Sequence, residues 1–362
     1  MGKLDLYTDR HLNLLRGRTD ELADKAVQEL ITDKSLVLAI NSWESLPEEL
    51  PETFPPALIR YFRFFRKKPA TRDQSFIRDI QAFFASHSGL VLSLLGFYSL
   101  PYTYAFGDGA EVLVRSEKLV KNPGKRLAET ALFVLECYRP GAFMTDQRIL
   151  LVLAKVRLIH AMSRYFIRKY ARDWDPEWGQ PINQEDLLAT NLSFSLLISR
   201  GIKKSNQFLS SSEREKLLAY WGLIGYYLGV ELQFWPETNK EAFELERKIR
   251  KRHLRPSEAG TTLLQSLMGF YRQNLVHPEV LPFLEDLLQY YMGKEVSVAL
   301  KLNASGKVPD WLLRNVMKLN LFGQHPRGSN FGLIYRNFLK NTRHSLGFDV
   351  AIDLSLPHGN SA

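Results

Sequence analysis

The sequence predicts an all-α fold, and three observations support this prediction. Apolar residues recur at the three- and four-residue spacing of a helix through most of the chain. Strand-like alternation is confined to two short segments, EVLVRS (111–116) and VSVALKL (296–302). Hydrophobic residues make up 45% of the 362 residues, and no Pro/Gly/Ser-rich linker or internal repeat divides the chain. We therefore expect a single large helical domain with a short appendage at each end.

The longest uncharged segment covers residues 80–107, which contain no Asp, Glu, Lys or Arg. A membrane-spanning helix requires about 20 predominantly apolar residues. This segment is interrupted by several serines, by His87 and by Pro101. A buried helix that ends in a turn near Pro101 fits this composition better.

Two helices are predicted next, over residues 124–138 and 145–171. The second should begin with Thr145 as its N-cap and Asp146 in its first turn, since both residue types stabilise a helix start. Further helical patterns cover residues 185–199, 211–231, 239–252, 260–273 and 280–292, the first of them capped by Asn183.

The chain is basic, with a formal charge of +9 and a pI of about 9.4. This excess is compatible with nucleic acid, anionic lipid or acidic ligands and identifies none of them. The densest basic segment, RYFRFFRKK (60–68), alternates aromatic residues with cations. It could stack on bases or lie on a membrane surface. The favoured interpretation is a helix that buries Tyr61, Phe62, Phe64 and Phe65 and leaves its cations in water.

A single cysteine, Cys137, excludes an internal disulfide and a cysteine-rich zinc site. The N-terminal residues MGKLDLYTDRHLNLL lack the uninterrupted apolar stretch of a secretory signal. We therefore expect a cytoplasmic protein, with contact to a membrane surface left open. The sequence does not predict the oligomeric state.

The common catalytic motifs are absent from the sequence. There is no G-x-x-x-x-G-K-[ST], H-E-x-x-H, C-x-x-C, G-x-S-x-G or G-x-G-x-x-G. The eight histidines occur singly, so a metal site with several histidines would have to assemble from distant segments.

One histidine lies within a long apolar helix, in the segment KVRLIHAMSR (155–164). A lone imidazole such as His160 can be the axial ligand of a haem, because the porphyrin supplies the other four nitrogens. Arg157 and Arg164 lie near the same face and could pair with haem propionates. From this segment alone, a hydrogen-bonded core histidine beside structural arginines is the simpler interpretation.

A second group of polar residues occurs in GKRLAET (124–130). Arg126, Glu129 and Thr130 are spaced i, i+3 and i+4, which places them on one face of an otherwise apolar helix. Burying a cation, a carboxylate and a hydroxyl together costs free energy, so their burial would indicate a functional role. The alternative is a solvated edge with an Arg–Glu pair.

Several segments in order resemble a known family. The chain is similar to the haem-dependent oxygenases that include the bacterial latex-clearing rubber oxygenases and the fungal MpaB-type enzyme of mycophenolic acid biosynthesis. The resemblance divides the chain into an N-terminal helical extension (1–74), an oxygenase core (75–275) and a C-terminal helical cap and tail (276–362). It is carried by SLPYTYAFGDGAEVLVRSEKL (99–119), RLAET (126–130), VRLIHAMSR (156–164), PINQEDLLATNLSFS (181–195), YWGLIGYYLGVE (220–231) and WPETNKEAFELERKI (235–249).

The resemblance implies a fold and an activity. We expect a helical domain that encloses a b-type haem, with core helices packed as in globins. We expect a haem b-dependent oxygenase that uses O2 to oxidise or cleave a carbon–carbon double bond of a lipophilic isoprenoid or polyene substrate, with no nucleic-acid partner. Two alternatives stay open: a haem-binding sensor or carrier without turnover, and a haem-free helical protein that binds membranes or nucleic acid.

The resemblance also implies roles for particular residues. His160 corresponds to the family's proximal haem ligand, and with it we assign Arg157 and Arg164 to the cofactor. Arg126 and Thr130 correspond to residues on the distal side, where oxygen binds.

The sequence departs from the rubber oxygenases at one distal position. Glu129 replaces the lysine that these enzymes carry just before the threonine, so the charge there is reversed. Glu129 could move protons at the reacting carbon. The family's catalytic glutamate lies in the region of GDGAEV, which makes Glu111 the other candidate for the general base.

Overall fold

The computed structural model describes residues 2–67, 75–116, 118–275, 278–319 and 330–356. Within these residues there is no strand, and β-type pairing is limited to two isolated bridges, Phe106 with Leu254 and Ala142 with Asp146. The all-α prediction is confirmed. Both strand-like segments begin in helices, α8 and α17.

The elements in chain order are α1 (Lys3–Leu6), α2 (Asp9–Arg16), α3 (Glu21–Leu30), α4 (Lys34–Asn41), α5 (Pro56–Phe65), α6 (Ser75–Leu94), the π-helical turn η1 (Leu95–Ser99), α7 (Leu100–Tyr104), α8 (Gly107–Arg115), α9 (Lys118–Lys121), α10 (Pro123–Cys137), α11 (Arg148–Tyr170), η2 (Pro176–Trp178), α12 (Gln184–Lys204), α13 (Ser211–Tyr227), η3 (Leu232–Phe234), α14 (Asn239–His253), α15 (Glu258–Asn274), η4 (Pro278–Phe283), α16 (Leu284–Met292), α17 (Lys294–Ala299), α18 (Asp310–Asn315), η5 (Val316–Leu319) and α19 (Phe331–Leu346).

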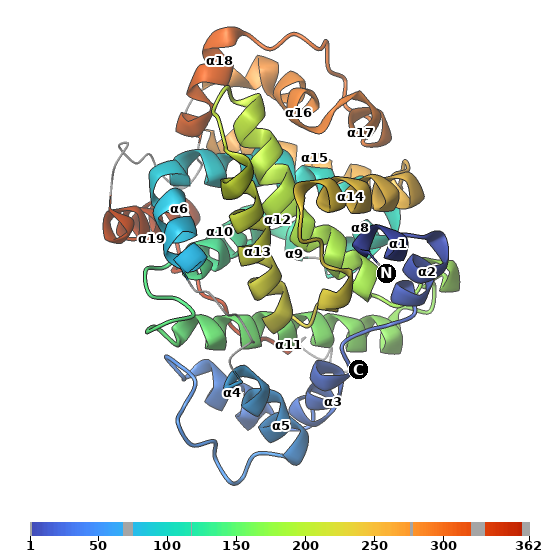
Figure 1. Cartoon of the computed structure of the whole chain (residues 1–362), viewed down its shortest axis with the longest axis vertical. Coiled ribbons are helices and arrows are strands. Elements are labelled where there is room, and N and C mark those ends of the chain that lie inside the picture. The colour runs from blue at the N-terminus through green and yellow to red at the C-terminus, as the bar shows by residue number, and fades with distance from the viewer. Residues whose placement is uncertain (1, 68–74, 117, 276–277, 320–329, 357–362) are drawn as a thin grey trace.

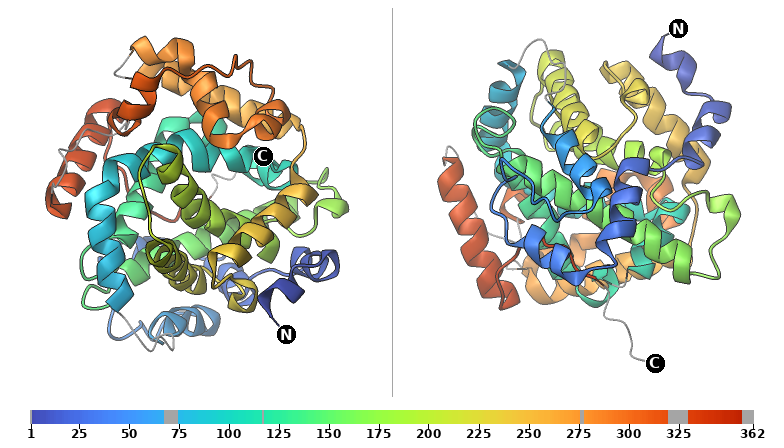
Figure 2. Two further views of the ribbon diagram at one scale, coloured as in Figure 1. Left: turned by 45° about the horizontal axis from the view of Figure 1, so that its top comes forward. Right: turned by 90° about the horizontal axis from the view of Figure 1, so that it is seen from below.

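Helix α11 crosses the molecule and separates two groups of helices (Figure 1). On one side lie the N-terminal helices α3, α4 and α5, and on the other lie α10, α12 and α13. Contacts of α11 with α3, α10 and α13 join the two groups. Helix α19 lies at the edge of the molecule in both views of Figure 2 and packs against α10. The helices before and after the predicted core therefore pack directly on core helices. The predicted division into three parts stays a prediction.

The start predicted for α11 is wrong. The helix begins at Arg148, and Thr145 and Asp146 lie before it in a turn. The carbonyl of Gly141, a residue with φ of +85°, accepts the N–H groups of both Thr145 and Asp146. Because this turn uses their backbone groups, helical bonding starts later. The N-cap position is Gln147, and Oδ1 of Asp146, one residue earlier, accepts the backbone N–H of Arg148 at 2.9 Å.

The helical run does not stop at Pro101, as the sequence predicted. It passes from α6 through η1 into α7. In a π turn each carbonyl pairs with the N–H five residues later, and Pro101 has no N–H to offer Gly96. The hydroxyl of Tyr271 donates to the Gly96 carbonyl instead, at 2.7 Å. A residue from α15 thus satisfies the group that the proline leaves free.

The stretch Ser75–Tyr104 is long and apolar enough to cross a membrane. It is the sole candidate among the described residues, and 67% of its most apolar window is buried inside the protein. The predicted burial of this segment is confirmed.

The basic aromatic segment RYFRFFRKK is also mostly interior. Tyr61, Phe62 and Phe65 in α5 are buried, and Phe64 is half-buried. The aromatic rings therefore belong to the core and do not form a stacking surface, which confirms the favoured interpretation. Lys68, the last residue of the segment, lies outside the described residues.

Helices α12 and α13 pack closely against each other beside an apolar cavity. The side-chain amide of Asn191 in α12 donates to the Trp221 carbonyl of α13 at 2.7 Å. A Cβ atom on Gly225 would approach the same amide nitrogen to 2.6 Å, so only glycine fits there. The predicted cap of α12 is confirmed, since the Asn183 side chain accepts the Asp186 N–H at 3.0 Å.

Candidate functional site

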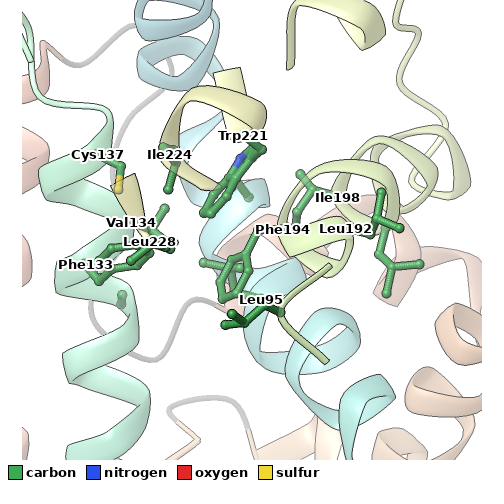
Figure 3. Packing of buried hydrophobic residues seen from close by; sticks show 14 of the residues in the cluster. Leu95, Phe133, Val134, Cys137, Leu192, Phe194, Ile198, Trp221, Ile224 and Leu228 are labelled. Atoms are coloured by element: carbon green, nitrogen blue, oxygen red, sulfur yellow. The ribbon is translucent and has the colours of Figure 1, made fainter. Parts of the chain in front are cut away.

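A cavity of about 310 Å³ lies among α8, α10, α11, α12 and α13. Its walls are mainly apolar. Phe133 from α10, Phe194 from α12 and Trp221 from α13 line it, and Figure 3 shows these side chains within the surrounding hydrophobic packing. The rings of Phe194 and Trp221 stack with a centroid distance of 4.8 Å and an interplanar angle of 17°. The ring of Phe133 is tilted by 58° against that of Trp221, with a centroid distance of 6.4 Å, so three separate helices contribute rings to one aromatic wall.

His160 projects from α11 and lines this cavity. Its Nδ1 is buried and has no hydrogen-bond partner. Its Nε2 makes no hydrogen bond to the residues that the structure describes and, unlike Nδ1, is not fully buried. Because the ring lines the cavity, this nitrogen is open to it. The simpler interpretation, a core histidine held by hydrogen bonds, does not match this environment.

The ring of His160 is uncharged at neutral pH. Desolvation by burial, together with the positive charges of Arg164 and Arg126, lowers its pKa to about 3. A metal ligand must be the neutral imidazole, with a free nitrogen lone pair. Within the described residues, no three or more His, Cys, Asp and Glu side chains are grouped to hold a metal ion. His160 can therefore serve as a single protein ligand.

Arg126, Glu129 and Thr130 line the same cavity from α10. Nη1 of Arg126 lies 3.4 Å from Oε2 of Glu129, and the Thr130 hydroxyl donates to the Arg126 carbonyl at 2.9 Å. The side chain of Arg126 is 34% exposed and that of Glu129 is 17% exposed. The prediction that these residues share one face, and that the first two pair, is confirmed. The structure brings all three to the cavity that His160 borders.

Arg157 and Arg164 point away from the cavity, toward α3. Two nitrogens of Arg157 contact the carboxylate of Asp20 at 2.5 and 2.7 Å. Nε of Arg164 contacts Oδ1 of Asp24 at 2.7 Å. Neither arginine lines the cavity. The structure therefore does not bring them to the site where we predicted contact with haem propionates, and their carboxylate partners come from the N-terminal helices.

Glu111, the second candidate for the general base, does not line the cavity either. Its neighbours Gly109 and Val112 do, while its own carboxylate pairs with Arg115 one turn later on α8. Of the two glutamates, the structure places Glu129 at the cavity.

Sequence analysis missed a second histidine at the cavity, His253 at the end of α14. Its Nδ1 lies 3.1 Å from Oδ2 of Asp108, and its Nε2 lies 3.1 Å from Oε1 of Glu185. Burial disfavours the charged ring, but the hydrogen bonds to the two carboxylates outweigh burial and raise the pKa of His253. The guanidinium of Arg16 contacts both carboxylates as well.

Asp186 also lines the cavity beside this charge network. Its carboxylate receives one hydrogen bond from the Asn183 side chain at 2.8 Å and one from Arg16 at 3.3 Å. Burial nevertheless raises its pKa to about 6. The sequence showed only the capping role of this segment, since the charged partners of Glu185 and Asp186 come from α2 and α14.

Comparisons with known proteins agree with this architecture. The family described as "ER-bound oxygenase mpaB/B'/Rubber oxygenase, catalytic domain" matches residues 80–320, more than half of the chain. The solved structure of latex clearing protein LCP in the closed state is similar in fold, with a TM-score of 0.68 and 19% sequence identity over 94% of this chain and 93% of that one. No match to a curated protein was found.

Proposed function

Because the chain belongs to the family of MpaB-type and rubber oxygenases, we propose that it is a haem b-dependent oxygenase. It would use O2 to oxidise or cleave a carbon–carbon double bond of a lipophilic isoprenoid or polyene substrate. The observation that carries this proposal is His160, a neutral imidazole with no hydrogen-bond partner among the described residues, at the wall of an apolar cavity. Family membership supports an oxygenase, and the name rubber oxygenase supports a polyisoprene-like substrate.

The residues present fit a haem. Nε2 of His160 is free to donate its lone pair, and the ring is uncharged without losing any hydrogen bond. Val156 and Ile159, on the same helix, give the cavity an apolar wall beside the imidazole. When bound, the haem would supply the redox-active iron at which dioxygen reacts.

The polar group on α10 supplies the charge. Arg126 carries a permanent positive charge at the cavity wall and would stabilise negative charge that develops during the reaction. The Thr130 hydroxyl currently donates to its own helix, so it must rotate before it can donate into the cavity. Glu129 pairs with Arg126 and so helps to position it. As the carboxylate of α10 that lines the cavity, Glu129 would also take the proton from a carbon beside the double bond.

The apolar walls suit a hydrocarbon chain. The aromatic wall of Phe133, Phe194 and Trp221 would exclude water and orient the double bond. The family description includes the words ER-bound, and a substrate of this kind concentrates in membranes. Peripheral contact of a cytoplasmic protein with a membrane is therefore part of the proposal. The buried rings of α5 speak against nucleic acid as a partner.

An absorbance spectrum of the purified protein tests the proposal. We expect a Soret band and one non-covalent haem b per chain. His160→Ala should lose the haem, while His344→Ala, a substitution on the exposed face of α19, should retain it. A colourless protein that takes up no added haemin would refute the proposal. Oxygen uptake with prenylated or polyene lipids then separates an oxygenase from a sensor or carrier.

A further inference from the structure

The segment that follows α19 lies against the helix of His160. Ala351, Ile352 and Asp353 line the same cavity as His160 and Val156. These three residues lie beyond residue 320, where the match to the oxygenase family ends. Part of the cavity wall is therefore supplied from outside the catalytic domain that the family comparison recognises.

Asn41, the last residue of α4, fastens this segment. Its Nδ2 donates to the carbonyl of Leu354 at 2.9 Å, and its Oδ1 accepts the N–H of Leu354 at 2.9 Å. One side-chain amide thus satisfies both backbone groups of a residue next to the three lining residues. Asn41 also lies outside the matched region, at the opposite end of the chain.

A buried lysine on α11 makes the second attachment. Nζ of Lys155 lies 3.1 Å from Oδ1 of Asp353 and 3.5 Å from the Asn41 carbonyl. The Lys155 side chain is only 8% exposed, and Asp353 is its single ion-pair partner among the described residues. Because an unpaired buried ammonium is costly, this pair favours the docked segment.

Apolar anchors flank the lining residues on both sides. Val350 and Leu354 are buried in the core. Ala351 and Asp353, which lie between them, are exposed residues that also line the cavity. Asp349, just before this stretch, is exposed and pairs only with Arg343 at 3.6 Å. The segment is therefore held over residues 350–354.

We propose that residues 350–354 form a wall of the ligand cavity that retains the cofactor beside His160, with Asn41 as the positioning residue. This inference rests on the proposed function for the identity of the ligand, a haem. If residues 350–354 detach from α11, the cavity becomes exposed on that side. The release of any lipophilic ligand from the cavity therefore depends on the contacts that Asn41 and Lys155 make with this segment.

Cysteine labelling tests whether the segment lines the occupied cavity. Cys137, the natural cysteine, is buried, so Ile352→Cys introduces one accessible thiol. At a haemin concentration about ten times its Kd, maleimide labelling of this variant should slow about tenfold. Phe348→Cys, four residues earlier and exposed, is the matched control and should react at an unchanged rate. Equal labelling of Ile352→Cys with and without haemin would overturn the proposal.

Ligand release tests the fastening. Asn41→Ala removes two hydrogen bonds, and we expect transfer of haem to a scavenging apoglobin to become about tenfold faster. Asn315→Ala removes an amide that, among the described residues, bonds only to Trp311 of its own helix, and this variant should leave the rate unchanged. Hydrogen exchange should show lost protection of the Leu354 amide in Asn41→Ala alone. Lost protection with an unchanged release rate would refute a wall function.

The same measurements are run with a lipophilic fluorophore, anilinonaphthalene sulfonate, in place of haemin. If the wild-type protein takes up no haemin, the proposed function fails. The fluorophore still decides the present inference: faster release from Asn41→Ala supports it, and equal release from wild type and variant overturns it.

Discussion

Two histidines border one cavity, and their surroundings shift the pKa values of the two rings in opposite directions. His160 has no hydrogen-bond partner among the described residues, and its pKa falls to about 3 because burial and two arginines disfavour the charged ring. His253 lies between the carboxylates of Asp108 and Glu185, which raise its pKa against the effect of burial. Both histidines have arginines close by in sequence. The carboxylates that the fold brings to each ring decide the outcome, and for His253 they come from α8 and α12.

The largest expected effect comes from removing each of the two rings in turn. His160→Ala should abolish haem binding at little cost in stability, because the ring it removes has no polar partner. His253→Ala should retain haem but lower the free energy of unfolding by about 3 kcal/mol, because it leaves two buried carboxylates without this partner. Haem titration and urea unfolding of both variants measure the contrast. Haem loss from His253→Ala in a folded protein would move the ligand to that residue.

The next effect concerns the charge that acts on the cavity. Arg126→Ala should keep the haem and lower oxygen-dependent turnover about a hundredfold, since it removes a donor to developing negative charge. Thr130→Ala should act in the same direction. Lys125→Ala is the control, because this neighbouring cation contacts the ring of Phe348 and does not line the cavity. Full activity in both α10 variants would exclude them from the distal side.

The two rings should also give opposite dependences of stability on pH in the haem-free protein. The folded pKa of His160, about 3, lies below the ordinary value of 6.5, so its contribution should make stability rise with pH between those values. The folded pKa of His253 is raised, so its stabilising contribution is complete below pH 6.5 and is lost as the pH rises through the folded value. Urea unfolding across a range of pH measures this dependence. His160→Gln should remove the rise of stability at low pH, and His253→Gln should remove the loss of stability at higher pH. If neither variant altered the profile, the assigned directions of the two pKa shifts would be wrong.

The smallest expected effect concerns Glu129. Its pairing with Arg126 leaves the cavity open to small ligands, so the ferric protein should bind imidazole or cyanide readily. Glu129→Lys should slow this binding severalfold, because the substitution reverses the charge next to Arg126. Glu129→Gln should keep the haem and lower turnover if the carboxylate moves protons. Glu111→Lys, outside the cavity, should bind ligands as the wild type does.

Local patterns in the sequence were sufficient to predict the helices and the face they bury. Tyr61, Phe62 and Phe65 are interior, as the alternation of rings and cations in α5 indicated. Arg126, Glu129 and Thr130 share a face because helical spacing alone determines it. The late start of α11 was not predictable in this way, since it depends on the positive φ of Gly141 and the turn that follows.

Partners from distant segments explain the rest. Arg157 and Arg164 lie near His160 in sequence, but Asp20 and Asp24 of α3 hold both on the far side of α11. His253 gave no signal, because its carboxylate partners come from other helices: Asp108 lies 145 residues earlier in the chain, in α8, and Glu185 lies in α12. The family resemblance supplied the role predicted for His160, which helical spacing alone left undecided.

Two ion pairs of α11 reach beyond the region that the family comparison recognises. A fragment limited to residues 80–320 would contain Arg157 and Lys155 without Asp20 and Asp353. Both cations are buried in the whole protein, so the fragment would carry charges that only water or misfolding could satisfy. We therefore expect a stable protein to require residues on both sides of the region that the family comparison recognises, at least as far as Asp20 and Asp353.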